Sequence, residues 1–398
     1  MTTTINNEHK ELNFSSEREQ SQACLNSAEH EKNQGRKVLN VPNSTDRGNV
    51  IRNVPHLRFP EFEGEWEDFL INDVCSEFKS GKNIKADSIS ESGEYPVYGG
   101  NGLRGYTSSY NHEGLYVLIG RQGALCGNVR SVNGKTYITE HAIAAAGNEK
   151  SNTSFLHYLF LKMNLGQYSD QSAQPGLAVN KLLKLEVSLP PISEQKKIAK
   201  LLSLLDERIA TQNKIIDKLQ SLIKGIGKQL FMDNQNWRTV KIGELLRIGN
   251  GKDYKHLSIG KIPVYGTGGQ MLLVNDYLYD GESVCIGRKG TIDTPMFLKG
   301  KFWTVDTLFY TYDFKDVLPK FCYYLFLQIN WKLYNEGTGV PSLSKSTIEN
   351  IKVKIPSLEQ QQKICSILDC YEHKTNNEEQ ILELYHSEKQ YLLRQMFI

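Results

Sequence analysis

Two glycine-rich stretches of this 398-residue chain carry side chains that can bind nucleic acid. YPVYGGNG (95–102) and IPVYGTGG (262–269) are near repeats, and IGRQG (119–123) and IGRKG (286–290) follow them. Arginine, lysine, asparagine and glutamine are the side chains that read base edges or hold phosphates. Each can also be a solvated surface residue, and an arginine can instead brace its own turn. The candidate DNA contacts are Tyr98, Asn101, Arg104, Tyr106, Arg121, Gln122 and Lys181 in the first copy, and Lys252, Tyr265, Thr267, Gln270, Arg288, Lys289 and Lys345 in the second.

Motifs for catalysis are incomplete. Gly100-Asn-Gly-Leu-Arg-Gly105 has the spacing of a dinucleotide-binding loop, but no helical pattern follows it to receive a pyrophosphate. Gly134-Lys-Thr resembles the end of a P-loop, yet Val129 stands where the first glycine is required. LPPI (189–192) lacks the polar first residue of the amino-methyltransferase signature, and there is no His-Glu-x-x-His zinc motif. The sequence therefore predicts no catalytic site, no metal site and no cofactor in this chain.

The composition, 39% hydrophobic and 23% charged, is that of an ordinary globular protein. Because the formal net charge is only +2, any contact with nucleic acid must come from local patches. The seven cysteines form no C-x-x-C pair, which favours reduced thiols. No apolar run reaches the roughly 18 residues of a membrane helix, and the N-terminus lacks the apolar core of a secretory signal. These features predict a cytoplasmic protein without a membrane segment.

The chain is an internal repeat with a period of about 166 residues, too long for a solenoid. Trp66 and Trp237 open matching segments, and each copy later has an apolar helical stretch, FLHYLFLKMNL from Phe155 and FCYYLFLQINW from Phe321. The predicted divisions are a disordered N-terminal extension (1–53), a first domain (54–192), a first helix (193–231), a second domain (232–357) and a second helix (358–398).

Each copy ends on a heptad pattern of about 37 residues, or about 55 Å of helix. The first has a single polar break, at Gln212. Two amphipathic helices on separate cores are the alternative, but a small domain cannot cover that length, so we expect an antiparallel coiled coil. Its seam is predicted at Ile198, Leu202, Leu205, Ile209, Ile216, Leu219, Ile223, Ile226 and Leu230, and at Ile364, Leu368, Tyr371, Leu382, Tyr385, Leu392 and Met396.

The globular parts have short strand-like runs, such as LYVLIG (115–120) and SVCIG (283–287), between glycine- and asparagine-rich turns. The predicted fold class is α+β: two mixed α/β domains separated by two long helices that form the coiled coil, with the copies related by a pseudo-two-fold.

Several of these motifs together resemble the specificity subunit of type I restriction–modification systems, over about residues 54–398. They are VPHLRFPEFEGEW (54–66), the paired IGRQG and IGRKG, and the proline-to-helix junctions LPPISEQKKIAKLLSLLD (189–206) and IPSLEQQQKICSILD (355–369). The resemblance implies two target-recognition domains that each read half of a split, asymmetric site on double-stranded DNA. It also implies assembly with two modification (methyltransferase) subunits, docked on the helices, and with restriction subunits. S-adenosylmethionine, ATP and Mg²⁺ would belong to those partners, so the chain alone would not be an enzyme.

Two other functions stay open at this point. A DNA methyltransferase with fused recognition domains would need a cofactor-binding unit of well over about a hundred residues, for which the repeat leaves no room. A coiled-coil scaffold protein without a DNA role would also fit the two helices. The family's loops vary in content, so the candidate contacts rest on residue type alone, and the recognition sequence and its spacer length are not encoded in any visible motif.

Overall fold

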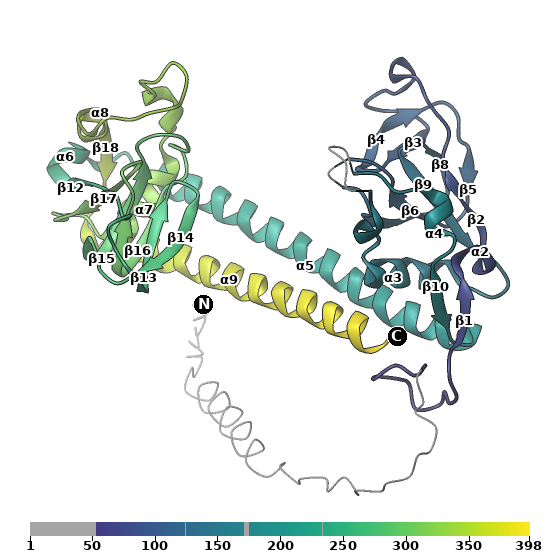
Figure 1. Cartoon of the computed structure of the whole chain (residues 1–398). Coiled ribbons are helices and arrows are strands. Elements are labelled where there is room, and N and C mark those ends of the chain that lie inside the picture. Colours follow the sequence, from purple (N-terminus) through teal and green to yellow (C-terminus); the bar gives the residue numbers. More distant parts are fainter. Residues whose placement is uncertain (1–52, 124, 171–174, 233) are drawn as a thin grey trace, which may run out of the picture. The chain divides into compact units, whose positions relative to one another are not determined.

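The computed structural model describes residues 53–123, 125–170, 175–232 and 234–398. The predicted extension (1–53) lies outside these residues except for Asn53. From Asn53 to Ile398 the chain is one compact unit, in which two sets of strands are joined by the long helices α5 (Ile192–Met232) and α9 (Leu358–Gln395) (Figure 1). We call the part with strands β1 to β10 domain 1, and the part with β11 to β18 domain 2.

Domain 1 is built on two four-stranded sheets and a strand pair. The first sheet has the order β2-β9-β6-β7 and the second β4-β3-β8-β5, and β1 pairs with β10. The strands are β1 (Glu67–Leu70), β2 (Cys75–Ser80), β3 (Tyr95–Gly99), β4 (Gly102–Thr107), β5 (His112–Glu113), β6 (Tyr116–Gly120), β7 (Val129–Val132), β8 (Lys135–Ile138), β9 (Ala142–Gly147) and β10 (Glu186–Leu189). The helices are α2 (Ile71–Val74), α3 (Thr153–Met163) and α4 (Val179–Leu182), with the 3-10 turns η1 (Ala86–Ser88) and η2 (Leu165–Tyr168).

Domain 2 repeats this plan with longer strands. Its main sheet has six strands in the order β12-β17-β15-β16-β13-β14, and β11 pairs with β18. The strands are β11 (Arg238–Lys241), β12 (Arg247–Asn250), β13 (Ile259–Gly266), β14 (Gly269–Val274), β15 (Tyr279–Gly287), β16 (Met296–Thr304), β17 (Leu308–Tyr312) and β18 (Lys352–Ile355). The helices are α6 (Ile242–Leu245), α7 (Pro319–Gln328) and α8 (Lys345–Asn350), with the 3-10 turn η3 (Trp331–Tyr334).

The sheets of the two domains differ at one corner. In domain 2, β15 and β16 pair without a break from Tyr279↔Phe302 to Cys285↔Met296. In domain 1 the same register is split into β5–β8 and β6–β7. Gly114 (φ 109°) and Gly134 (φ 96°) stand at the split and exchange backbone hydrogen bonds of 3.2 and 3.1 Å. Only glycine adopts such φ values without strain, so the chain can turn there from one sheet into the next.

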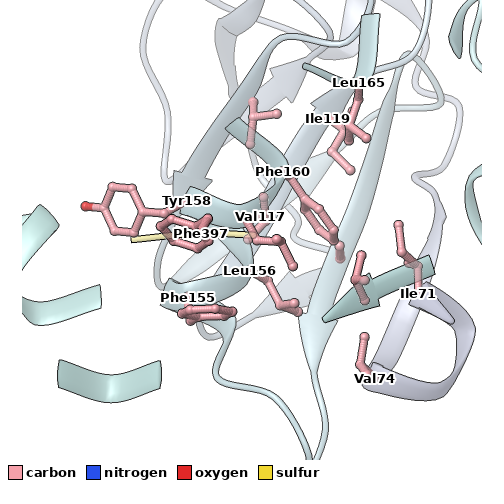
Figure 2. Packing of buried hydrophobic residues seen from close by; sticks show 14 of the residues in the cluster. Ile71, Val74, Val117, Ile119, Phe155, Leu156, Tyr158, Phe160, Leu165 and Phe397 are labelled. Carbon is pink, nitrogen blue, oxygen red and sulfur yellow. The ribbon is translucent and has the colours of Figure 1, made fainter. Parts of the chain in front are cut away.

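The core of domain 1 lies between the first sheet and α3. Asn152 caps α3 by accepting a hydrogen bond from the Phe155 backbone N–H (3.1 Å). Phe155, Leu156 and Phe160 then face inward and are fully buried. Figure 2 shows these side chains with Val117 and Ile119 of β6 and with Phe397 from the far end of the chain. The apolar face of α3 therefore packs against both the first sheet and the C-terminal end of the chain.

The long helices pack along each other in opposite directions, as the contacts of their ends show. The start of α5 (Ile198, Leu202) belongs to the core of domain 1, together with Met396 and Phe397 at the end of α9. The end of α5 (Phe231) belongs to the core of domain 2, together with Ile364 and Leu368 at the start of α9. The α+β class with an antiparallel helix pair and an internal repeat is confirmed.

Every seam position of the prediction is buried or half-buried in the structure. Gln212, the polar break, is buried at 6% exposure and donates to the Glu378 carboxylate (2.6 Å) and backbone oxygen (3.0 Å). These two residues occupy equivalent positions of the two copies. Since equivalent residues meet only near a symmetry axis, the pseudo-two-fold axis passes close to this pair.

Each long helix is fastened to a domain by a matching aromatic cluster. Phe155 stacks on Phe397 (ring centroids 5.1 Å apart) beside Trp66, and Phe321 stacks on Phe231 (5.3 Å) beside Trp237. A fully buried glutamine repeats the pattern at the helix starts. The Gln195 amide accepts from Asn152 N–H (2.8 Å) and donates to the Pro190 oxygen (2.8 Å).

Gln361 does the same in domain 2. It accepts from Leu318 N–H (2.9 Å) and donates to the oxygens of Asp316 (3.0 Å) and Pro356 (3.1 Å). Because buried backbone groups need partners, these bonds fix where each domain sits on its helix. No described helix is both long and apolar enough to cross a membrane.

Candidate nucleic-acid interface

The turns that contain Arg121 and Arg288 are anchored by the same backbone bonds in both domains. Arg121 N–H donates to the His141 oxygen (2.9 Å), and Leu177 N–H donates to the Arg121 oxygen (2.9 Å). Arg288 N–H donates to the Thr307 backbone oxygen (2.8 Å), and Leu343 N–H donates to the Arg288 backbone oxygen (2.9 Å). Each turn is thus held between the loop before β9 or β17 and the loop before α4 or α8.

The next residue of each turn makes a bridge to the same loop. Gln122 pairs with Gly176 and Lys289 pairs with Ser342. Both arginines are half-buried, whereas Gln122 and Lys289 are exposed. The backbone of the turn is therefore the same in both domains, while the exposed side chain is an amide in one and a cation in the other.

A second matched turn carries Lys82 and Lys252. Lys82 N–H donates to the Ile138 oxygen (3.0 Å) and Lys252 N–H to the Thr304 oxygen (2.9 Å). The preceding glycines, Gly81 and Gly251, have no room for a side chain, since a Cβ would lie 2.2 and 1.9 Å from a backbone oxygen. Both lysine side chains are exposed.

Of these two lysines, Lys252 is among the DNA contacts predicted from the sequence and Lys82 is not. The signal was present in the sequence, because Ser80-Gly-Lys-Asn83 and Asn250-Gly-Lys-Asp253 occupy the same place in the two copies. Lys82 is the candidate that the sequence reasoning missed in domain 1.

In domain 1, a hollow of about 340 Å³ brings Asn101, Arg104 and Gln122 together with His141. The Gln122 side-chain oxygen lies 3.2 Å from Nδ1 of His141, and Nε2 of His141 lies 3.2 Å from the Glu140 carboxylate. Gly99, Gly100 and Gly123 form the remaining wall. A Cβ on Gly100 would lie 2.7 Å from the His141 oxygen, so glycine is required where the β3–β4 turn meets this loop. His141 is a second residue that residue type alone did not single out.

In domain 2, a hollow of about 320 Å³ brings Arg288, Lys289 and Lys345 together with Asn250 and Glu336. Glu336 accepts hydrogen bonds from the hydroxyls of Thr347 and Ser344 (2.9 Å from Ser344), and these hold the pKa of its carboxyl below the ordinary value. This hollow opens on the α8 side of the shared turn, whereas that of domain 1 opens on the β3–β4 side. Equivalent turns therefore present different surfaces.

Lys181 and Lys345 lie in α4 and α8 but not at equivalent positions. Lys181 forms an ion pair with Asp170, and the corresponding pair in domain 2 is Thr347 and Glu336. Lys345 is half-buried and takes part in the hollow. The acidic residue is thus kept in both domains, as Asp170 and Glu336, while its partner is a cation in domain 1 and a hydroxyl in domain 2.

The remaining candidates lie outside both hollows. Tyr98 and Tyr265 are half-buried against the small core clusters beneath them, and Tyr106 lies in β4 opposite Pro96. Thr267 lies beside the Lys289-Gly290 turn, 3.7 Å from where a Cβ of Gly290 would be. Gln270 is exposed in β14. Residue type alone could not predict where these five side chains lie.

The chemistry available at these surfaces is hydrogen bonding and charge. The hollow of domain 1 combines two amides, an imidazole and one guanidinium, whereas that of domain 2 has three cations with an acid. Burial raises the pKa of the Cys75 and Cys285 thiols to about 12, so neither is a thiolate nucleophile near neutral pH. Within the described residues, no group of three or more histidines, cysteines and carboxylates is placed to hold a metal ion.

Comparison with known proteins gives a consistent result. The family described as "Type I restriction modification DNA specificity domain" matches residues 63–221 and 234–384. A specificity subunit of the type I restriction enzyme EcoprrI from Escherichia coli is 42% identical over 154 residues, which is 38% of this chain and 38% of that protein. A putative type I specificity subunit, S.HindORF215P from Haemophilus influenzae, is 27% identical over 79% of this chain and 89% of its own length.

Solved structures share the fold. The chain superposes on the S subunit of a type I restriction–modification system from M. genitalium with a TM-score of 0.64 at 19% identity, covering 87% of this chain and 99% of that one. A chain from a structure on complex assembly and conformational transition of the type I system gives a TM-score of 0.52 at 14% identity, covering 84% and 97%.

Proposed function

Since this chain belongs to the family of type I restriction–modification specificity subunits, we propose that each of its domains reads one half of a bipartite, asymmetric DNA site. The observation that carries the proposal is the doubled turn at Arg121 and Arg288. An identical backbone frame presents Gln122 and His141 in one domain but Lys289 and Lys345 in the other. Different side chains on the same frame are what two different half-sites require.

The chemistry of each surface suits the task. Glutamine and asparagine pair bidentately with adenine, and arginine with guanine, in the major groove. Lysines on the matched Lys82 and Lys252 turns suit phosphates, which position a protein without selecting sequence. Glu140 and Glu336 repel phosphates but can accept from the cytosine amino group. Because the net charge is only +2, binding depends on these local groups.

The helix pair is proposed to dock two modification subunits, with restriction subunits joining when DNA is cut. S-adenosylmethionine, ATP and Mg²⁺ then belong to those subunits, and this chain contributes sequence recognition without catalysis. The assembled complex acts on DNA in the cytoplasm.

Exchange of one domain tests independent reading. Residues 54–190 are replaced by the equivalent residues of a family member with another specificity, and the methylated sites are mapped after co-expression with the modification subunit. We expect one half-site to change while the other half and the spacer stay the same. The matched control exchanges residues 232–357 and should change the opposite half. Alteration of both halves by either exchange would refute independent reading.

The purified chain incubated with S-adenosylmethionine and DNA tests the methyltransferase alternative. We expect no methyl transfer by the chain alone and restored transfer when the modification subunit is added. Absence of DNA binding by the chain together with that subunit would favour the scaffold alternative.

A further inference from the structure

A groove of about 510 Å³ runs beside domain 2, where the end of α5 meets the start of α9. Ile226, Trp237, Ile364 and Ile367 form its apolar wall, and Gln360 and Lys363 its polar edge. Ile367 is 42% exposed there. The groove is thus an open apolar surface at the junction of both helices with a domain.

The equivalent place beside domain 1 is filled by the chain itself, through residues 53–63. Leu57 N–H donates to the oxygen of Gln395 (2.8 Å), and the ammonium of Lys197 lies 4.5 Å from the ring centre of Phe59. Between them, Arg58 makes two hydrogen bonds of 2.8 Å to Glu194, whose side chain is fully buried.

Those three partners are the counterparts of groove residues. Gln395, Glu194 and Lys197 correspond in the repeat to Gln229, Gln360 and Lys363, all of which line the groove of domain 2. The domain 1 segment has no counterpart before domain 2, because α5 ends at Met232 and β11 already begins at Arg238. Among the residues that the structure describes, one groove is therefore filled and its equivalent is open.

Burial differs accordingly. Trp66 is 2% exposed, whereas its counterpart Trp237 is half-buried. Ile198 is 1% exposed and Ile364 7%. The apolar surface that residues 53–63 cover in domain 1 is left partly open in domain 2.

We propose that an extended segment of a partner protein binds in this groove, with an aliphatic residue, an uncharged hydrogen-bonding residue and an aromatic residue in succession. Leu57-Arg58-Phe59 supplies the pattern. The middle residue is uncharged because Gln360 replaces Glu194, and an arginine there would be buried without an acid. A second copy of this chain is a poorer source, since its residues 53–63 are already bound to its own domain 1. The inference goes beyond DNA reading and does not depend on it.

The test uses the full-length protein and two fluorescent peptides, without DNA. One peptide has the sequence of residues 54–62 (VPHLRFPEF), and the other carries Arg58→Gln. We expect the Arg58→Gln peptide to bind more tightly, by at least about tenfold, because the unchanged peptide would bury a guanidinium without a carboxylate partner. Gln360→Glu in the protein should reverse this preference. The unchanged peptide would then bind more tightly to the Gln360→Glu protein than to the wild type, and a misfolded variant would not show such a gain.

Two further variants locate the binding. Ile367→Glu should abolish it, whereas Leu384→Glu, at a residue of α9 that is 68% exposed and outside the groove, should not. Failure of both peptides to bind, or equal binding to the Ile367→Glu variant, would overturn the proposal. Dimerisation that Ile367→Glu prevents would make a second copy the occupant. Peptide binding that appears only after removal of residues 1–52 would make this chain its own occupant. Each of these last two results would also overturn the proposal of a partner protein.

Discussion

Domain 1 and domain 2 are attached to the helix pair by equivalent glutamines and equivalent aromatic clusters, but domain 1 adds an ion pair from its preceding segment to a fully buried carboxylate. Arg58 and Glu194 meet with side chains 11% and 0% exposed. In domain 2 the position of Glu194 holds Gln360, which is exposed. Duplication therefore preserved the contacts that place a domain on the helix, while the contacts of the preceding segment belong to one copy.

The same division holds at the proposed DNA surfaces. Backbone bonds at Arg121 and Arg288 are within 0.1 Å of each other in length, and the exposed side chains beside them differ in charge. The frame is made of backbone groups, which any sequence supplies, so side chains on it can change without loss of the fold. This separation is what a scaffold needs if its specificity is to diverge.

The largest change in stability is expected when the Arg58–Glu194 ion pair of domain 1 is removed. Arg58→Ala leaves the Glu194 carboxylate buried without its partner, which should lower the free energy of unfolding of domain 1 by about 3–5 kcal/mol. Hydrogen exchange of strand amides, measured by mass spectrometry, follows the two domains separately. Protection should fall in β6 and β9 and stay unchanged in β15 and β17.

Two variants serve as controls for Arg58→Ala. Adding Glu194→Gln gives domain 1 the neutral residue type of domain 2 and should recover a large part of the loss. Arg238→Ala breaks an ion pair with Asp316 whose side chains are 58% and 70% exposed, so its effect should stay within about 1 kcal/mol. Equal losses for Arg58→Ala and Arg238→Ala would contradict the importance of the buried pair.

A pH dependence should also separate the domains. Burial, together with the nearby Lys389 ammonium, lowers the pKa of His157 to about 4, and Asp206 opposes this only in part. The unfolded chain takes up this proton near pH 6.5, so domain 1 loses stability as pH falls from about 6.5 to about 4, by about 3 kcal/mol in all. The counterpart Tyr323, whose pKa burial raises to about 12, stays neutral over this range.

Urea unfolding at pH 6.5 and pH 4 measures this difference. His157→Tyr, the residue type of domain 2, should reduce the loss of stability on acidification by about 3 kcal/mol. His373→Tyr on the exposed face of α9 should leave the loss unchanged, and carboxylates elsewhere cancel in the comparison. An identical pH dependence in the wild type and in His157→Tyr would show that this imidazole does not destabilise domain 1 in acid.

Sequence alone predicted the repeat and the helix pair because these follow from periodicity and from similarity between the copies. It could not predict which candidates share a hollow. Gln122 meets His141, and Lys289 meets Ser342, through loops that are brought together only when distant strands pair. The Arg58–Glu194 pair likewise joins residues 136 positions apart, which no local pattern reveals. Lys82 differs, since comparison of the two copies would have found it.

A smaller effect, on DNA binding, is expected from substitutions in the Arg288 turn, whose exposed side chain differs from that of the Arg121 turn. Arg288→Ala should weaken DNA binding by about 1–3 kcal/mol if the guanidinium reads a base. Lys289→Gln, which gives the turn the residue of domain 1, should reduce the slope of log K against log salt by about 0.9 if the ammonium meets a phosphate. Lys374→Ala, an exposed lysine of α9 away from both turns, is the control. The Arg288 guanidinium lies 3.5 Å from the Asp306 oxygen, so lower thermal stability with unchanged salt dependence would mean that it only braces its turn.

The smallest effect should come where the two domains agree. Lys82 and Lys252 stand on turns of the same shape, held by backbone bonds of 3.0 and 2.9 Å, and a residue that is identical above two different surfaces suits a contact with phosphate better than one with a base. Lys82→Ala and Lys252→Ala should each lower the salt slope by about one, and the double variant by about two, with every DNA sequence weakened alike. Binding to a pool of randomised duplexes at several salt concentrations, followed by sequencing of the bound fraction, measures both quantities. A change in sequence preference at one half-site only, after either substitution, would show that the lysine reads bases and that the two turns have diverged in function despite their common frame.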